Sequence, residues 1–224
     1  MCGRFIMTVD FEMVKAAFRL RAQLYDLKPG FNIAPGQDIP VITNTPGGRE
    51  ISPMRWGLIP HWAKDAKIGY KMINARAEKV GEKPAFKGAF RRRRCLIPAS
   101  GFYEWKKEGR VKQPLLITLP GEKVFALAGI WEHWLAPGGS AVYSCSIITT
   151  AANRHLEGIH NRMPVILAGE RDYEQWLSPD DPLFLQHLLR PYEGDMLVYP
   201  VSARVNSPQD DDPGLIEPQL LNLS

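Results

Sequence analysis

Apolar residues in this chain form short runs, many of them rich in β-branched side chains and separated by turns that contain Gly or Pro. Runs of this kind favour β-strands over helices. The turns at 44–48 and 108–109 predict hairpins between the strands on either side of them. Strands are expected at residues 39–43, 51–58, 102–107, 115–119, 124–130, 142–149 and 196–201.

Helical spacing is confined to a few segments. Asp10 suits the N-cap of a first helix, because Phe11, Val14 and Phe18 follow it on one helical face. Further helices are expected at residues 171–177 and 182–189. Strands dominate and do not alternate regularly with helices, so a doubly wound parallel sheet is not expected. The sequence predicts the α+β class, with a single domain over residues 1–224 that has an antiparallel β-rich core, a distorted barrel, and surrounding helices.

The composition is that of a folded protein. Of the 224 residues, 45% are hydrophobic and 23% are charged, and the net charge is +4, which excludes disorder as the dominant state. No apolar run approaches the ~20 residues of a membrane span, and no signal-peptide pattern opens the chain. We therefore expect a cytoplasmic, monomeric protein, nucleoid-associated if the source is bacterial. The modest positive charge permits a polyanionic partner without requiring one.

The cysteines give no sign of a disulfide or metal framework. The 3 cysteines, Cys2, Cys95 and Cys145, are odd in number and far apart in the sequence. They predict neither a set of disulfides nor a paired-cysteine metal site. His61 and His133 have no ligand spacing with them, so we expect no metal and no cofactor.

The start of the chain carries the most distinctive chemistry. Met1 is usually excised when a residue as small as cysteine follows, which would leave Cys2 with a free α-amine beside its thiol. The ordinary pKa values of these groups are about 7.7–8.0 and about 8.5, so modest local tuning would give useful amounts of both nucleophiles at neutral pH. An aldehyde would form an imine with the amine, and the thiol would then close a five-membered thiazolidine ring. The alternative is that Cys2 is an incidental residue near a frayed terminus.

Two segments supply candidate partners for this nucleophile. Asn74 and Arg76 would lie on one side of an extended backbone, although Asn74 would also suit the N-cap of a helix at residues 75–80. Glu104 would share a strand face with the ring of Phe102. Desolvation there would raise the pKa of the carboxyl and suit it to acid/base work. The alternative is an exposed glutamate on an edge strand.

A loop histidine and several arginines complete the set of candidates. His160, close to Arg162, would move protons or meet a phosphate; the alternative is a structural histidine. The positive run at residues 91–94, read as a strand, would place charge on both faces and so be mostly solvated surface. Arg4, Arg76 and Arg162 each lie within two residues of a candidate catalytic group, where cations would meet phosphates that flank a reacting sugar. Aromatic residues that would stack on bases, or belong to the core, are Trp62, Phe86 and Trp105.

Seven short blocks, in this order, resemble the SRAP family, named for SOS-response-associated peptidases. Any one block alone would be a weak signal, whereas the ordered set is specific and extends from Cys2 to about Pro218. The blocks are MCGRF at residues 1–5, FNIAPG at 31–36, MRWGL at 54–58, INARAE at 73–78, RCLIPA at 94–99, GFYEW at 101–105 and HNRMP at 160–164.

The resemblance implies a β-rich fold and a DNA damage response function. Members of the family crosslink an N-terminal cysteine to abasic sites in single-stranded DNA, which shields the lesion. The implied roles are nucleophile for Cys2, orienting amide for Asn74, acid/base for Glu104 and assistance of sugar-ring opening for His160. The small Ala85 stands near the family's bulky wedge position, so either Phe86 takes that part or the wedge is absent. Positions that match residues holding DNA are Arg4, Asn32, Pro35, Trp62, Arg76, Thr149 and Arg162.

Three other functions stay open on the sequence alone. An N-terminal-nucleophile amidohydrolase also begins with Cys-Gly after processing, but its fold needs more long helices than this sequence predicts. A cysteine peptidase would remove its own Met1, with Cys2 as nucleophile and Glu104 and His160 assisting. A DNA-binding module without any covalent chemistry is the third alternative. Abasic-site crosslinking or lyase-type activity is the function that we expect.

Overall fold

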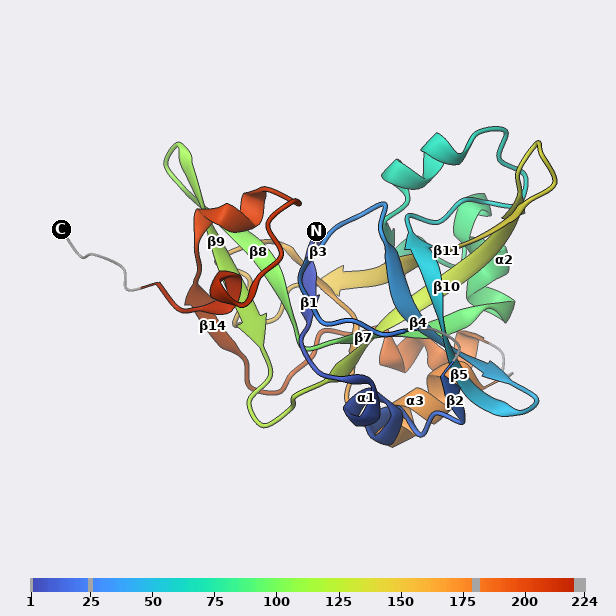
Figure 1. Ribbon diagram of the computed structural model, residues 1–224, viewed down its shortest axis with the longest axis horizontal. Coiled ribbons are helices and arrows are strands. Elements are labelled where there is room, and N and C mark those ends of the chain that lie inside the picture. Colours follow the sequence, from blue (N-terminus) through green and yellow to red (C-terminus); the bar gives the residue numbers. More distant parts are fainter. Residues whose placement is uncertain (1, 24–25, 179–181, 220–224) are drawn as a thin grey trace.

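A five-stranded antiparallel sheet forms one side of the molecule (Figure 1). The computed structural model describes residues 2–23, 26–178 and 182–219. Hydrogen bonds between β8 and β9 confirm the expected hairpin at residues 102–119. In spatial order the strands of this sheet are β14 (Leu197–Pro200), β9 (Val111–Thr118), β8 (Gly101–Glu108), β1 (Phe5–Met7) and β3 (Gly30–Ile33).

A second sheet closes on itself. Antiparallel pairing runs from β11 through β10, β7 and β4 to β5, and a parallel pairing of β5 with β11 aligns Trp56 with Cys145. These strands therefore form a closed barrel, which confirms the expected α+β fold with a distorted barrel. The strands of this sheet, in order, are β12 (Arg162–Pro164), β11 (Ala141–Ala151), β10 (Phe125–Leu135), β7 (Arg94–Ala99), β4 (Asp38–Thr45), β5 (Gly48–Trp56) and β2 (Ala22–Gln23), with β6 (Asn74–Arg76) beside β11 and β13 (Ile166–Leu167) beside β10.

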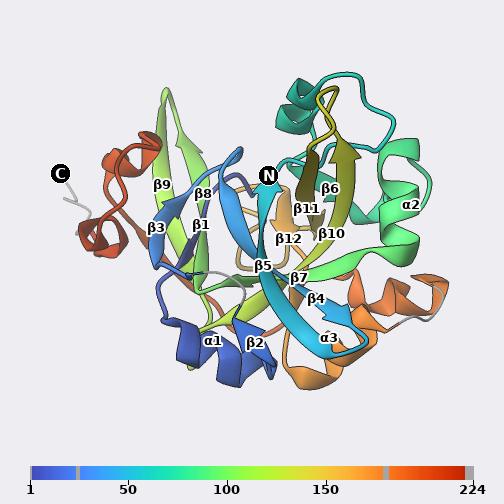
Figure 2. The same cartoon turned by 45° about the vertical axis from the view of Figure 1, so that its right-hand side comes forward.

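Short helices surround the barrel (Figure 2). In α1 (Phe11–Phe18), the Asp10 carboxylate accepts the Met13 N–H at 2.9 Å, which confirms the expected N-cap. No helix of the described residues has the length and apolar character needed to cross a membrane. The remaining helices are α2 (Pro84–Arg92), α3 (Glu170–Leu177) and the 3-10 turns η1 (Ala66–Lys71), η2 (Ala77–Lys79), η3 (Pro182–Leu188), η4 (Ala203–Asn206) and η5 (Pro213–Ile216).

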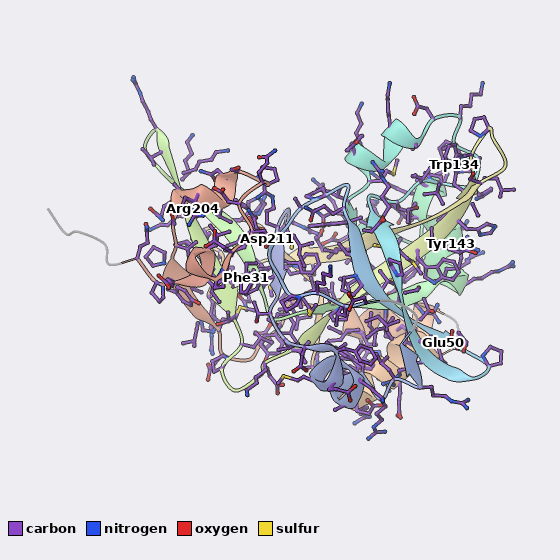
Figure 3. The ribbon with its side chains drawn as sticks, in the orientation of Figure 1. Phe31, Glu50, Trp134, Tyr143, Arg204 and Asp211 are labelled. Carbon is purple, nitrogen blue, oxygen red and sulfur yellow. The ribbon has the colours of Figure 1, made fainter. Side chains whose placement is uncertain are left out.

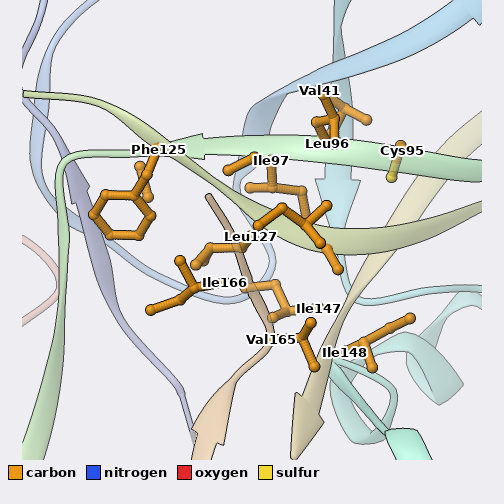
Figure 4. Close-up of a cluster of buried hydrophobic side chains, with 14 of the residues drawn as sticks. Val41, Cys95, Leu96, Ile97, Phe125, Leu127, Ile147, Ile148, Val165 and Ile166 are labelled. Carbon is orange, nitrogen blue, oxygen red and sulfur yellow. The ribbon is translucent and has the colours of Figure 1, made fainter. Parts of the chain in front are cut away.

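Apolar side chains of the barrel strands form the core (Figure 4). Val41, Leu127 and Ile147, from different strands, are all fully buried. Gly129 leaves no room for a side chain, because an added Cβ would lie 2.8 Å from the Cys95 Sγ. Where the two sheets meet, the ring of Phe5 on β1 packs edge-on against Trp56 on β5, with the ring centroids 5.3 Å apart. This contact fixes the N-terminal strand against the barrel.

Most of the expected elements are present, and three expectations differ from the structure. The predicted helix at 182–189 is the 3-10 turn η3, and the predicted strand at 51–58 ends at Trp56. The prediction that the arginine run at 91–94 is mostly solvated is wrong for Arg94. The run begins in α2, and the Arg94 guanidinium is buried, donating to the carbonyl oxygens of Trp176 at 2.8 Å and Phe90 at 2.9 Å. Arg94 therefore holds α3 against the barrel.

Candidate functional site

Four elements meet where β1 enters the first sheet. Phe5 pairs with Phe102, so the antiparallel register places the residues before β1 beside Glu104 on β8. The Asn74 side chain at the start of β6 donates to the carbonyl oxygen of Cys2 at 2.8 Å. His160 completes the group, because its charge acts on the Glu104 carboxyl. The structure thus brings together the four residues predicted to be catalytic.

Cys2 is fully buried, which excludes the interpretation of an incidental residue at a frayed end. Its Sγ lies 3.9 Å from the carbonyl oxygen of Arg4. Burial raises the pKa of the thiol, and the negative charge of Glu104 acts in the same direction. Both effects favour the protonated thiol in this arrangement. The expectation that local tuning supplies both nucleophiles at neutral pH concerns the Met1-free chain and stays a prediction.

Glu104 is a buried carboxyl on an interior strand. Glu104 is 2% exposed, and its strand β8 lies between β9 and β1. The alternative of an exposed glutamate on an edge strand is therefore wrong. Burial raises the pKa of the Glu104 carboxyl, while the neighbouring His160 acts in the opposite direction. A carboxyl with a raised pKa can donate a proton and take it back near neutral pH, as general acid/base catalysis requires.

Hydrogen bonds fix the orientations of His160 and Asn74. The His160 Nδ1 accepts the backbone N–H of Arg162 at 3.0 Å, so the neutral ring carries its proton on Nε2. The Asn74 Oδ1 is buried and has no hydrogen-bond partner among the described residues. It is therefore an open acceptor beside the Cys2 backbone. Asn74 belongs to a strand, so the alternative in which it caps a helix is wrong.

One face of the second sheet gathers the polar residues next to this group. Arg76 on β6 is directly opposite Thr149 on β11, and Arg162 on β12 is opposite Ala151. Residues opposite each other, or two apart along a strand, point to the same face. The Arg162 guanidinium donates to the Thr149 carbonyl oxygen, and Thr149 itself is fully buried. Two predicted phosphate-binding arginines thus lie on one face, next to the catalytic candidates.

Glu78 joins this face, although sequence reasoning gave it no role. Its carboxylate forms a two-point ion pair with Arg162, with Oε1 2.6 Å from Nη1 and Oε2 3.0 Å from Nη2. The sequence feature that could have pointed to Glu78 is its position as the last residue of the INARAE block at 73–78. Spacing alone cannot show which cation such a carboxylate meets, because Arg162 is far away in the sequence.

Arg4 and Asn32 bind other parts of the chain. The Arg4 Nη1 donates to the Asn32 Oδ1 at 2.7 Å and to the Val205 carbonyl oxygen at 2.6 Å. The Asn32 amide donates to the carbonyl oxygens of Ser207 at 2.9 Å and Asp210 at 2.7 Å. These bonds attach the segment after β14 to β1 and β3. Figure 3 shows the same junction at Phe31 and Asp211, where the Asp211 carboxylate accepts both the Phe31 and Asn32 N–H groups.

Replacing Asn32 with alanine is expected to lower stability rather than DNA affinity. The change removes the acceptor of one Arg4 hydrogen bond and the donor to the Ser207 and Asp210 carbonyl oxygens, at a cost of about 2–3 kcal/mol. We expect the melting temperature to fall by about 5–10 °C, with DNA affinity retained below the transition. Thermal unfolding and DNA-binding titrations measure the two effects. The exposed Asn44→Ala is the matched control, and an unchanged melting temperature with weakened DNA binding would contradict this assignment.

The remaining predicted DNA-binding residues are spread more widely. Trp62 is 51% exposed in the loop before η1, and Pro35 is half-buried in the turn after β3. Phe86 on α2 is 6% exposed and packs in the core, so its ring is not presented to a base in this structure. Among the described residues, no cluster of His, Cys, Asp or Glu side chains is arranged to hold a metal ion.

Comparison with known proteins identifies the family of this chain and agrees with its fold. The chain belongs to the SRAP family, because the sequence model of that family, SOS response associated peptidase, matches residues 1–208. Abasic site processing protein YoqW of Bacillus subtilis strain 168 is 48% identical over 223 residues, an alignment that covers 97% of this chain and 99% of that protein. Abasic site processing protein HMCES of Gallus gallus is 32% identical, covering 85% of this chain and 66% of that protein.

A solved structure shows the same architecture. A crystal structure of a protein from Bacteroides thetaiotaomicron superimposes with a TM-score of 0.88 at 29% sequence identity, and the match covers 98% of this chain and 100% of that one. The α+β arrangement described above is therefore shared across distant sequences.

Proposed function

We propose that this protein binds abasic sites in single-stranded DNA and bonds covalently to them through Cys2 after removal of Met1. The observation that carries the proposal is the position of the buried Cys2 beside Asn74 and Glu104, with His160 next to Glu104 and two arginines on the neighbouring sheet face. Relatives named for abasic site processing support it. Single-stranded DNA is favoured because a reacting sugar has to leave a base stack to reach a buried group.

The first step opens the abasic sugar. In the closed form, C1′ carries a hydroxyl group and is bonded to the ring oxygen O4′. The bond between C1′ and O4′ breaks as the C1′ hydroxyl gives its proton to the Glu104 carboxylate, while O4′ accepts a hydrogen bond from the His160 Nε2 and takes its proton from solvent. This leaves an aldehyde at C1′ and a protonated Glu104, both next to the nucleophile. The open Asn74 Oδ1 orients the α-amine by accepting one of its N–H groups.

The second step joins protein and sugar. The α-amine attacks C1′ and passes one N–H proton to the carbonyl oxygen. Glu104 then gives its proton to the resulting hydroxyl, which leaves as water, and the second N–H proton returns to solvent, so that a neutral imine forms. The thiol then adds to the imine carbon, and its proton moves to the nitrogen as the thiazolidine ring closes. The amine reacts first, and the thiol carries the proton that the nitrogen needs, which accords with the burial that raises the pKa of the thiol. Holding the three groups together replaces a bimolecular encounter with a local one, which lowers the barrier by up to about 7–11 kcal/mol.

Incubation with an abasic oligonucleotide is expected to yield a heat-stable, one-to-one adduct. Its intact mass should equal that of the Met1-free protein plus the DNA, minus one water, since condensation releases one water. A denaturing gel and mass spectrometry measure the yield and the stoichiometry. Two control oligonucleotides carry an intact base or a tetrahydrofuran residue, which lacks the C1′ hydroxyl. Absence of the adduct with protein whose Met1 has been removed would overturn the proposal.

Peptidase activity, in the form of removal of Met1 by this same site, stays a prediction. The chemistry it needs is attack of the Cys2 thiol on the preceding carbonyl carbon, followed by hydrolysis of the resulting thioester. Glu104 and His160 would supply the proton transfers. Met1 retained in a Glu104→Ala variant, with Met1 absent from the wild type made in the same host, would support this activity.

A further inference from the structure

The Glu78 carboxylate binds the two terminal nitrogens of the Arg162 guanidinium, which are the atoms with which an arginine binds phosphate. Both guanidinium ends, Nη1 and Nη2, donate to the carboxylate, at 2.6 Å and 3.0 Å. A fork of this kind fits a carboxylate or a phosphate equally well, because both present two oxygens at a similar spacing. In the described structure, a backbone phosphate cannot take this face of Arg162 unless the Glu78 carboxylate leaves it.

Electrostatics keep Glu78 ionised in this position. The hydrogen bonds from Arg162 lower the pKa of the Glu78 carboxyl, and the charge of Arg76 acts in the same direction. Arg76 is exposed and shares the sheet face of Arg162. The carboxylate is therefore an anion within the field of two arginines, at a position where a DNA phosphate would also be attracted.

The surroundings allow Glu78 to leave while Arg162 stays in place. The Glu78 side chain is 52% exposed and lies on the short turn η2, whereas the Arg162 side chain is 14% exposed. Arg162 has a second anchor, because its Nη2 also donates to the carbonyl oxygen of Thr149. Its backbone N–H holds the His160 ring independently of the guanidinium. Rotation of Glu78 toward solvent would therefore open the fork without moving the catalytic histidine.

We propose that Glu78 is an internal anion that occupies a phosphate site formed by Arg76 and Arg162, and that a backbone phosphate of the bound DNA displaces it. Glu78 is then a specificity-determining residue, since every nucleic acid has to compete with it for Arg162. Only DNA held by further contacts at the site gains enough to displace the carboxylate. This inference rests on the proposed function, because it takes DNA as the ligand.

A charge-neutral variant tests the competition directly. Glu78→Gln keeps the shape of the side chain and removes its charge, so DNA should bind about 3–10-fold more tightly at low salt. The plot of log affinity against log salt concentration should steepen by about 0.7, the contribution of one phosphate in single-stranded DNA. The probe is a single-stranded oligonucleotide with a tetrahydrofuran abasic analogue, and fluorescence anisotropy over a salt series gives both quantities.

A nearby glutamate provides the matched control. Glu82→Gln changes the net charge by the same amount, but Glu82 is paired with Lys79 on the surface rather than with Arg162. It should alter the affinity less than twofold. Glu78→Ala, which removes the carboxylate altogether, should act in the same direction as Glu78→Gln. Thermal unfolding establishes that each variant is folded before its affinity is compared.

The possible results separate this inference from the proposed function. Unchanged or weaker affinity of both folded Glu78 variants, or an effect of Glu82→Gln equal to that of Glu78→Gln, would overturn the displacement of Glu78. Wild-type adduct formation with abasic DNA is measured alongside. Its absence in Met1-free protein would overturn the proposed function, whatever the Glu78 variants do.

Discussion

Replacing Cys2 with alanine is expected to reduce the heat-stable adduct with abasic single-stranded DNA to below about 1% of the wild-type yield. Alanine is small enough for Met1 still to be excised, so the variant keeps a free α-amine at its first residue. That amine can form an imine with the sugar aldehyde, but no thiol is present to close the ring. The imine hydrolyses readily, and the adduct should survive heating only when borohydride has reduced it first.

The Cys2→Ala experiment has three readouts. A denaturing gel with and without borohydride separates loss of ring closure from loss of all condensation, and intact mass establishes that Met1 is absent. Affinity for the tetrahydrofuran oligonucleotide should stay within about twofold of wild type, since the phosphate contacts are unchanged. Cys145→Ala removes another buried thiol and should leave the adduct intact. A full yield of heat-stable adduct from Cys2→Ala, without reduction, would exclude the thiazolidine.

The variant Glu104→Gln should slow adduct formation by about 10²–10⁴-fold and, at neutral pH, make the protein more stable. The amide can neither take the proton of the C1′ hydroxyl nor return one to the leaving water. Burial raises the pKa of the Glu104 carboxyl in the folded state, so folding becomes less favourable as pH rises through that pKa. Glutamine removes this cost, and the melting temperature should rise by about 2–6 °C.

The pH dependence distinguishes this explanation from a general change in packing. Below the ordinary glutamate pKa of about 4.3, Glu104 is protonated in both folded and unfolded states, so wild type and Glu104→Gln should melt at similar temperatures. Their difference should grow as pH increases toward neutrality. Thermal scans over a pH series and single-turnover adduct kinetics measure the two effects, with the exposed Glu122→Gln as control. A stability gain independent of pH would contradict the assignment of a raised pKa.

Local sequence patterns were sufficient for the elements whose partners are close along the chain. The hairpins β4–β5 and β8–β9 follow from apolar alternation around short turns, and Asp10 shows where α1 begins. The alternation in β8 also predicted that Glu104 shares a face with Phe102. The structure bears this out, because β8 pairs with β9 in unbroken register from Phe102 through Glu104, and residues two apart on a strand lie on one face.

Contacts between distant segments could not be inferred from such patterns. The strand β1 has three residues and little periodicity, and its position depends on pairing with β8 and β3. The burial of Cys2, and with it the raised pKa of its thiol, follows from that pairing and from no local pattern. The partners of Glu78 and Arg4 were hidden for the same reason. The family resemblance pointed to the site residues, whereas their hydrogen bonds and charges required the fold.

The bond from Arg4 to the Val205 carbonyl oxygen spans almost the full sequence, and this affects the order of events during synthesis. Contacts of such large sequence separation form late, because the entropy of closing a long loop has to be overcome first. On the ribosome, the first residues emerge long before residue 205 has been made. The contacts that hold Arg4, and with it the strand that follows Cys2, are therefore complete only after the segment around residue 205 has been made.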